Sequence, residues 1–250
     1  ETSTANGDIA NSPQEFVDLI DDMNSGDIDG VIFYGVNPVY NHPMADAVKS
    51  GIEKLQFSAA ISERMDETAE LVQFVSADRF FLESWNDAMP RNNYYSLCQP
   101  TIQPLFPESR QGQDTLLAWS GESETYYDVM TSNWKSNILK GESWDTALHD
   151  GVFEKPSNKI ISTEFGGDVM TAASKISPPS SGLELALYYK NTIGDGSYAN
   201  NPFMQECPDS VTKVTWDNYL MVSPKMAEDN DWSQEDVVVV EANGKKVNLP

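Results

Sequence analysis

The sequence predicts an α/β fold with a parallel sheet, followed by the beginning of a β domain. Apolar residues at 30–34, a helical pattern at 44–55 and a second apolar run at 57–61 give strand, helix and strand within about 30 residues. Near the end of the chain, Asn243-Gly244 separates two strand-like runs, which is typical of a hairpin turn. A chain of 250 residues, 40% of them hydrophobic, is also long and apolar enough to bury a core.

The first helix is predicted to begin at Pro13. Ser12 supplies a hydroxyl cap, Pro13 suits the first helical position, and Glu15 completes the capping pattern. The strands at 30–34 and 57–61 should then be parallel, because the helix between them makes a right-handed crossover. This βαβ unit puts the loop after residue 34 at the carboxyl end of a strand, which is the ligand-binding edge of open α/β sheets.

Weaker patterns follow this unit. They predict amphipathic turns at 66–74, a buried aromatic stretch at 80–85, a helix at 126–134, a strand at 160–165, a helix beginning at Ser223-Pro224, and hairpin strands at 237–242 and 246–249. Residues 177–182 read SPPSSG, a composition typical of a linker. We therefore divide the chain into a first domain at 1–136, an insertion or linker at 137–181, and a second domain at 182–250.

The strongly negative charge argues against polyanionic partners. Thirty-nine acidic residues against sixteen basic ones give a formal charge of -23, which repels nucleic acids and anionic lipids. The acidic surface is either an ordinary solvated face or a surface that attracts a soluble basic electron carrier, such as a small cytochrome. Salt-dependent association would favour the second interpretation.

Cysteine and histidine give no metal site. Cys98 and Cys207 are too few for an iron–sulfur or zinc ligand set, and we expect both to be buried packing thiols. His42 and His149 lack a second histidine at helical spacing, so surface or packing roles are expected for both. No GxSxG motif is present, and carboxylates are too abundant for any one to be singled out, so no catalytic residue is assigned.

Two polar stretches are candidate binding sites. The loop with Gly35, Asn37 and Pro38 offers backbone amides and a side-chain amide to a ligand, although it lacks the GxGxxG fingerprint and equally suits an ordinary turn. Asn200 and Asn201, before Pro202, form a second polar cluster, and residues 215–219 form a third. Each is either the floor of a ligand site or a turn that satisfies its own hydrogen bonds.

Four stretches together resemble the molybdopterin oxidoreductase family. They read GVNPVYNHP, ERMDETAELVQFVSADRFFLESWND, YYSLCQPTIQPLFPESRQGQDTLLAW and DGSYANNPFMQECPDSVTKVTWDNYLMVSPK. The details NPVYNHP, FLESWND and TKVTWDN are most similar to the molybdopterin-like, iron–sulfur large subunit of bacterial alternative complex III. The matches run over most of residues 12–136 and 182–250, and residues 137–181 match nothing in the family.

The resemblance implies a Rossmann-like α/β domain of the molybdopterin oxidoreductase type, followed by the truncated start of a β-barrel domain that resembles the molybdopterin-dinucleotide-binding domain. In cofactor-bearing relatives, the positions of Gly35, Asn37, Pro38, Asn200 and Asn201 line the cleft for molybdopterin guanine dinucleotide. The alternative complex III branch keeps the fold without the molybdenum cofactor, so these positions are expected to be vestigial here.

The same resemblance implies a function. It predicts a segment of a longer oxidoreductase subunit in a respiratory electron-transfer complex, carrying electrons from a quinol to cytochrome c or a similar acceptor. The segment itself is expected to be a cofactor-free scaffold, with the iron–sulfur clusters in the missing part of the parent protein. Other subunits of the complex are the expected partners, on the periplasmic face of the bacterial inner membrane. The alternative is a cofactor-binding segment of a molybdenum-dependent oxidoreductase.

Overall fold

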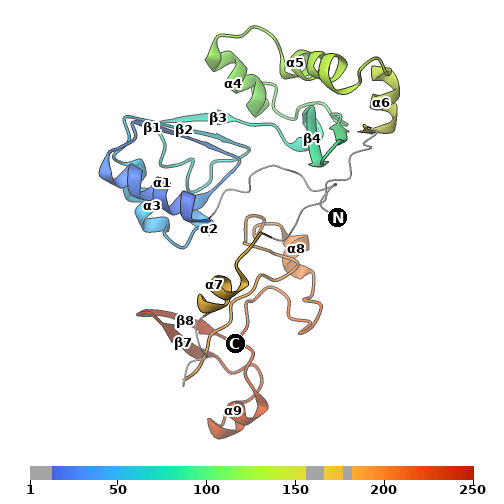
Figure 1. The fold of residues 1–250 in the computed structure, drawn as a ribbon. Helices are drawn as coiled ribbons and strands as arrows, with labels where there is room; N and C mark the ends of the chain where they lie inside the picture. The colour runs from blue at the N-terminus through green and yellow to red at the C-terminus, as the bar shows by residue number, and fades with distance from the viewer. Residues whose placement is uncertain (1–12, 156–165, 177–181) are drawn as a thin grey trace. The chain divides into compact units, whose positions relative to one another are not determined.

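The structure is a computed structural model that describes residues 13–155, 166–176 and 182–250. The chain forms two compact units, Glu1–Pro178 and Pro179–Pro250. Figure 1 shows their helices and strands. The Ser12 cap, the predicted strand at 160–165 and the predicted linker at 177–181 lie outside the described residues.

A three-stranded parallel sheet organises the beginning of the first unit. Its strands are β1 (Gly30–Tyr34), β2 (Phe57–Ser62) and β3 (Phe74–Ala77), hydrogen-bonded in the order β1-β2-β3. Helix α1 (Pro13–Ser25) precedes the sheet, and α2 (Pro38–Asn41) and α3 (Ala45–Ile52) connect β1 to β2. The α/β class and the βαβ unit are therefore confirmed, whereas β3 replaces the end of the predicted turns at 66–74.

One face of this sheet carries the first hydrophobic core. Phe33 of β1 and Ala60 of β2 are register partners, so they share that face. They pack with Ile20 and Met23 of α1 and Val48 of α3, all buried. Figure 1 shows α1 and α3 together on this side of the sheet. The apolar positions of the two helices recur at helical spacing, so burying them against the sheet is what orients both helices.

A second, antiparallel sheet, which the sequence patterns do not predict, follows β3. Its strands are β4 (Asn86–Arg91), β5 (Tyr94–Cys98) and β6 (Val152–Glu154), in the order β4-β5-β6. The helices packed against it are α5 (Tyr126–Asn133), a π-helix (Trp134–Ile138) and α6 (Trp144–Asp150). Helix α4 (Gly112–Ser120) packs instead against the parallel sheet, where Thr115 contacts Ser76 of β3. The predicted helix at 126–134 is thus confirmed as α5 and the first residue of the π-helix.

Trp134 is the centre of this second core. Its side chain has no exposed surface, and its ring meets those of Tyr95 and Trp144 edge-on, with both centroids at 5.9 Å. Its indole Nε1 donates to Asp87 Oδ2 at 2.8 Å, and the Tyr126 hydroxyl donates to Asp87 Oδ1 at 2.6 Å. One carboxylate on β4 therefore links the sheet to α5 and the π-helix. Burial and the hydrogen bond to Asp87 raise the pKa of Tyr126.

Two burial predictions are wrong. Residues 80–85 are not a buried aromatic stretch, since Phe80 and Phe81 are 37% and 57% exposed. Residues Phe81–Glu83 form a single 3₁₀ turn that points Glu83 inward, where its Oε1 accepts from Leu105 N at 3.0 Å. The expected pair of buried thiols is also absent, because Cys98 is half-buried and Cys207 is exposed.

The second unit contains α8 (Pro202–Glu206), α9 (Pro224–Asp229), β7 (Val238–Ala242) and β8 (Lys245–Leu249). Asn243 and Gly244 both have positive φ, at 50° and 77°, which the predicted hairpin turn requires. Helix α9 begins as predicted, with the Ser223 hydroxyl accepting from Met226 N at 3.2 Å. The hairpin and this helix are confirmed, whereas the start of a β-barrel stays a prediction.

The second unit buries little. Among its described residues only Asp209 is buried. Register places Val238, Val240, Val247 and Leu249 on one face of the hairpin. Helix α7 (Val169–Ser174), in the first unit, buries no side chain either, and Asp168 caps it through Met170 N and Thr171 N. No helix in the described ranges is both long and apolar enough to cross a bilayer.

Candidate functional site

The candidate loop begins where β1 ends. Gly35 has φ 62°, a left-handed conformation that favours glycine, and it turns the chain out of the strand. Its N–H donates to Ile61 O at 3.0 Å, which extends the β1–β2 ladder by one bond. Pro38 opens the short helix α2 and is buried with Val39. The loop therefore has the predicted position at the carboxyl edge of the sheet.

The Asn37 side chain joins this loop to the loop that follows β2. Its Oδ1 accepts from the Thr68 backbone N at 3.1 Å and from the Thr68 hydroxyl at 2.7 Å, and its Nδ2 donates to Glu67 Oε2 at 2.7 Å. Val39 N in turn donates to the Thr68 hydroxyl at 3.2 Å. Thr68 is completely buried. We call Asn37, Glu67 and Thr68 the loop latch.

The Asp66 carboxylate fixes the turn that contains Thr68 of the loop latch. Its Oδ1 accepts from the backbone N–H groups of Thr68 and Ala69 at 3.1 and 2.8 Å, and its Oδ2 accepts from the Ser62 hydroxyl at 3.1 Å. Asp66 thus forms the turn that holds Thr68 in place. The ordinary alternative for Asn37, a turn that caps its own backbone, is not what the structure contains, because its side-chain partners lie 30 and 31 residues away.

Further carboxylates follow β2 and β3 at the same edge of the sheet. Burial raises the pKa of Asp78, although the N–H groups of Arg79 and Gly112, which donate to its Oδ1 at 2.8 and 2.7 Å, act in the opposite direction. Burial also raises the pKa of Glu63; the charge of Arg64 acts against this effect and the charge of Asp78 adds to it. The edge is therefore acidic, and two of its carboxyl groups ionise less readily than usual.

We expect the free energy of unfolding of Asp78→Asn, measured against that of the native chain, to increase as the pH rises. The folded chain binds the Asp78 proton more tightly than the unfolded chain does, so the contribution of Asp78 to native stability falls between the unfolded pKa of about 4 and the raised folded value. Asparagine keeps the Oδ1 acceptor and removes this titration. Urea unfolding between about pH 3 and pH 7 measures the difference.

Asp128→Asn is the matched control with the opposite sign. Hydrogen bonds from Thr125 lower the pKa of Asp128, so its contribution to stability is present at neutral pH and is lost as the pH falls. The Asp128→Asn chain should be less stable than the native chain at neutral pH, with the difference shrinking in acid. Equal slopes for the two variants would contradict the assignment for Asp78.

A pyrophosphate group fits the candidate loop poorly. Such a group is bound by free backbone N–H donors in a region without negative charge. The Gly35 N–H is already bonded to Ile61, Pro38 has no N–H, and the Asn37 amide is bonded to Glu67. That bond lowers the pKa of Glu67, so the loop carries an ionised carboxylate that repels a phosphate. Among the described residues, no group of three or more His, Cys, Asp or Glu side chains is placed to hold a metal ion.

The remaining predicted site residues lie in the second unit. Asn201 caps α8, with its Oδ1 accepting from Phe203 N at 3.0 Å, and Asn200 is exposed in the turn before it. In the cluster at 215–219, Trp216 N donates to Gln205 O at 2.9 Å and the Tyr188 hydroxyl donates to the Tyr219 hydroxyl at 2.7 Å. For Asn201 and Trp216 these contacts favour the interpretation as turns.

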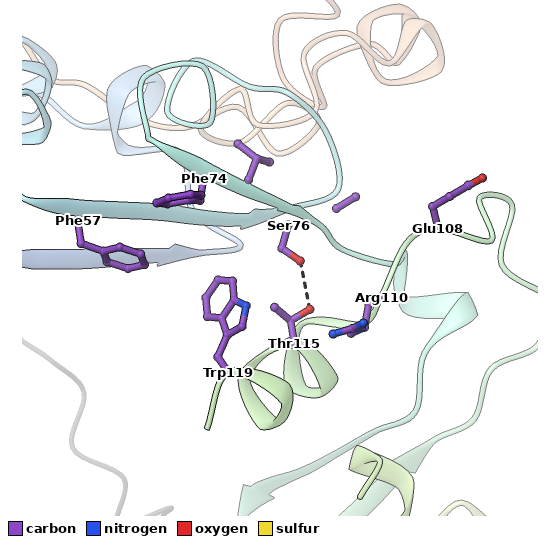
Figure 2. Close-up of a pocket in the computed structure, with 9 residues that line it drawn as sticks. Phe57, Phe74, Ser76, Glu108, Arg110, Thr115 and Trp119 are labelled. Atoms are coloured by element: carbon purple, nitrogen blue, oxygen red, sulfur yellow. Dashed lines mark hydrogen bonds between the residues drawn. The ribbon is translucent and has the colours of Figure 1, made fainter. Parts of the chain in front are cut away.

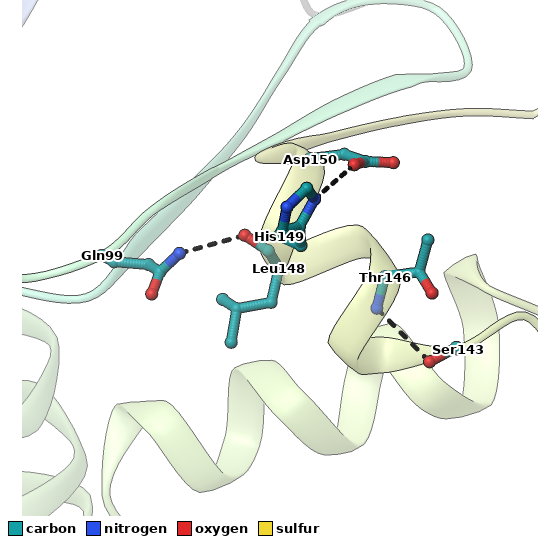
Figure 3. A network of polar contacts seen from close by, with 6 residues as sticks. All are labelled: Gln99, Ser143, Thr146, Leu148, His149 and Asp150. Carbon is teal, nitrogen blue, oxygen red and sulfur yellow. Dashed lines mark hydrogen bonds and ion pairs between the residues drawn. The ribbon is translucent and has the colours of Figure 1, made fainter.

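The two histidines have the roles expected of them. His42 packs against Phe16, with ring centroids 4.9 Å apart, and its Nδ1 accepts from Met44 N at 3.2 Å. His149 lies at the end of α6 with an 86% exposed side chain, and its Nδ1 is 2.9 Å from Asp150 Oδ1. Figure 3 also shows the hydrogen bonds from Gln99 to Leu148 O and from Thr146 N to the Ser143 hydroxyl, both of which hold α6 in place.

Sequence reasoning missed the two partners in the loop latch. Glu67 and Thr68 lie in an acidic stretch, DETAE, that has the composition of a surface turn. An Asp two residues before a Thr signals a local turn, which Asp66 does form. No local signal shows that this turn lies against the loop after β1, because the contact spans two strands.

Comparison with known proteins finds a sequence relative and structural neighbours. No protein-family model matches the chain. Over 229 residues it is 24% identical to the menaquinone reductase, molybdopterin-binding-like subunit, of Nitratidesulfovibrio vulgaris, with 88% of this chain and 33% of that protein covered. Its structure is similar to acetylene hydratase from Pelobacter acetylenicus, with a TM-score of 0.57, 12% identity, and 92% of this chain and 36% of that chain covered.

The sequence relative and the structural neighbour each match about the same share of their own length. The acetylene hydratase match shows that the two chains share a fold. The chain spans about a third of the length of both proteins it matches. The resemblance predicted from the four sequence stretches is confirmed: this chain is similar to a protein named as a molybdopterin-binding-like subunit of a menaquinone reductase.

Proposed function

We propose that this chain is a segment of the large, molybdopterin-oxidoreductase-like subunit of a respiratory electron-transfer complex. The complex carries electrons from a quinol to cytochrome c or a similar acceptor. The segment is a structural scaffold that binds no molybdenum cofactor, and iron–sulfur clusters lie in other parts of the parent protein. The relative's name, which combines menaquinone reductase with molybdopterin-binding-like, supports an oxidoreductase subunit of this kind.

The loop latch is the observation that carries the scaffold proposal. The Asn37 amide is the best ligand donor of the candidate loop, and it is bonded to Glu67 and Thr68 at 2.7 Å each. An amide used in this way holds two sheet loops together. The ionised Glu67 carboxylate beside it repels an anionic dinucleotide, and the overall charge of -23 adds to that repulsion.

The second unit is proposed to be the start of the β-barrel domain. Its described residues bury no apolar side chain, and one face of the β7–β8 hairpin carries four apolar residues. A two-stranded hairpin is only marginally stable by itself in water, so these residues need further strands to cover them. In the proposal the parent protein supplies those strands.

Elemental analysis of the purified parent protein tests this function. We expect iron without molybdenum or tungsten, and no fluorescence from released pterin. Stoichiometric molybdenum or tungsten together with pterin would instead establish the molybdenum-dependent alternative. Gly35, Asn37, Pro38, Asn200 and Asn201 would then have to rearrange to contact the cofactor.

The same purification tests the partners and the location. The proposal places the segment on the periplasmic face of the bacterial inner membrane, bound to the other subunits of the complex. The parent protein should therefore be recovered from the membrane fraction together with those subunits. Recovery only from the cytosol, free of other subunits, would contradict both parts of the proposal.

A further inference from the structure

The parallel sheet has a cavity on the face opposite α1 and α3. Helix α4 covers the carboxyl end of this face, where the Ser76 and Thr115 hydroxyls lie 3.1 Å apart and Gly112 packs directly on the Tyr34 ring. Beside α4 the face is hollowed by a cavity of about 700 Å³. This volume lies within the range of about 300–1,000 Å³ that is usual for small-molecule sites.

Aromatic rings line one end of the cavity. The Phe57 and Phe74 rings come from neighbouring strands and stack at 5.8 Å, with their planes 28° apart. Figure 2 shows the Trp119 indole of α4 opposite them across the cavity. The three side chains are 40%, 57% and 48% exposed. Parallel sheets are normally covered on both faces, so these rings have unused apolar surface that a planar ring would cover.

Arg110 lies at the other end. Its backbone N–H donates to Ala77 O at 3.1 Å, which fixes the residue beside β3. Its guanidinium makes no ion pair or hydrogen bond with any described residue. The planar guanidinium matches a carboxylate with two parallel hydrogen bonds.

We propose that this cavity binds a planar aromatic carboxylate, with the ring between Trp119 and the two phenylalanines and the carboxylate on Arg110. The Ser76 and Thr115 hydroxyls lie between the two ends, where they can bond a polar substituent of the ring (Figure 2). A single negative charge is specified because Glu108 also lines the cavity and the chain carries -23 overall. Both repel a polyphosphate more strongly than a monocarboxylate.

A ligand-observed NMR titration of the full chain with three naphthalene probes tests the proposal. The probes are 2-naphthoate, the neutral 2-naphthalenemethanol and the cationic 2-naphthylmethylamine. We expect 2-naphthoate to bind with a Kd on the order of 0.1–1 mM, which is usual for so small a ligand. The alcohol should bind about tenfold more weakly because it lacks the charged hydrogen bonds. Tighter binding of the amine, or no saturable binding of 2-naphthoate, would overturn the proposal.

Arg110→Ala, with Arg91→Ala as its control, distinguishes binding at Arg110 from a general effect of removing one positive charge. Both residues are exposed arginines of the first unit, but Arg91 pairs with Glu154 at 3.4 Å and lies outside the cavity. Arg110→Ala should weaken 2-naphthoate binding about tenfold and leave the alcohol unchanged, whereas Arg91→Ala should change neither. Equal effects of the two variants would overturn the assignment of Arg110.

Phe74→Ala tests the aromatic end. It should weaken the acid and the alcohol alike, with circular dichroism confirming that the variant is folded. Unchanged binding of both probes by folded Phe74→Ala would place the ring elsewhere. The cavity contains no residue of the loop latch, so these titrations and the metal analysis of the parent protein succeed or fail independently.

Discussion

Replacing Trp134 by alanine is expected to lower the free energy of unfolding by about 3–5 kcal/mol. The Trp134 side chain is fully buried between Tyr95 and Trp144, so its removal leaves a cavity that the surrounding rings cannot close. The change also removes the donor to Asp87 Oδ2, and with it one of the links between β4 and the helices. Urea unfolding followed by far-ultraviolet circular dichroism measures the loss.

Two variants complete this test. Trp119→Ala makes the same chemical change at a half-exposed position on α4 and should cost less than about 1 kcal/mol. Trp134→Phe keeps most of the ring and removes the N–H donor, so its loss should lie between those of the two alanine variants. A loss for Trp134→Ala no larger than that for Trp119→Ala would contradict the central role of Trp134.

Replacing Asn37 by alanine is expected to lower the free energy of unfolding by about 1–3 kcal/mol. Three hydrogen bonds disappear, and the hydroxyl of completely buried Thr68 loses its acceptor. If the segment is a scaffold, electron transfer by the parent protein should fall only as far as folded protein is lost. Turnover lost at unchanged stability would contradict the scaffold proposal.

A double-mutant cycle isolates the loop latch itself. Thr68→Val removes the hydroxyl but keeps the shape of the side chain, and the Asn37→Ala, Thr68→Val pair measures the coupling between the two residues. We expect a coupling free energy of about 1 kcal/mol, which is typical of residues in one hydrogen-bond network. Additive effects of the two changes would mean that the latch does not couple the loops.

The position of the candidate site could be predicted from the sequence, but its chemistry could not. The apolar run ending at Tyr34, followed by Gly35 and Pro38, is enough to place a loop at the carboxyl edge of a parallel sheet. Whether Asn37 faces a ligand or another loop depends on Glu67 and Thr68, 30 and 31 residues along the chain. Local patterns do not report such distant pairs.

The antiparallel sheet was missed for a related reason. Strand β4 reads NDAMPR, which lacks the β-branched and aromatic residues that favour strands, and it contains a proline. It is held in place by distant partners, since Asp87 bonds to Tyr126 and Trp134, 39 and 47 residues away. Tertiary contacts overrode a weak local preference. The 3₁₀ turn at Phe81–Glu83 likewise buries Glu83, which bonds Leu105, while Phe80 and Phe81 stay exposed.

The sequence by itself determined the βαβ unit, the Asn243-Gly244 hairpin and the start of α9, and its longer stretches carried the resemblance to the molybdopterin oxidoreductases. The three structural features depend on patterns within about 30 residues, where periodicity, caps and turn residues act locally. Only the tertiary structure decided that Asn37 bonds Glu67 and Thr68, that Asp87 bonds Trp134, and that Arg110 lines one cavity with three aromatic rings. These depend on which residues meet after strands pair and helices pack, because burial and long-range hydrogen bonds are set by the whole fold.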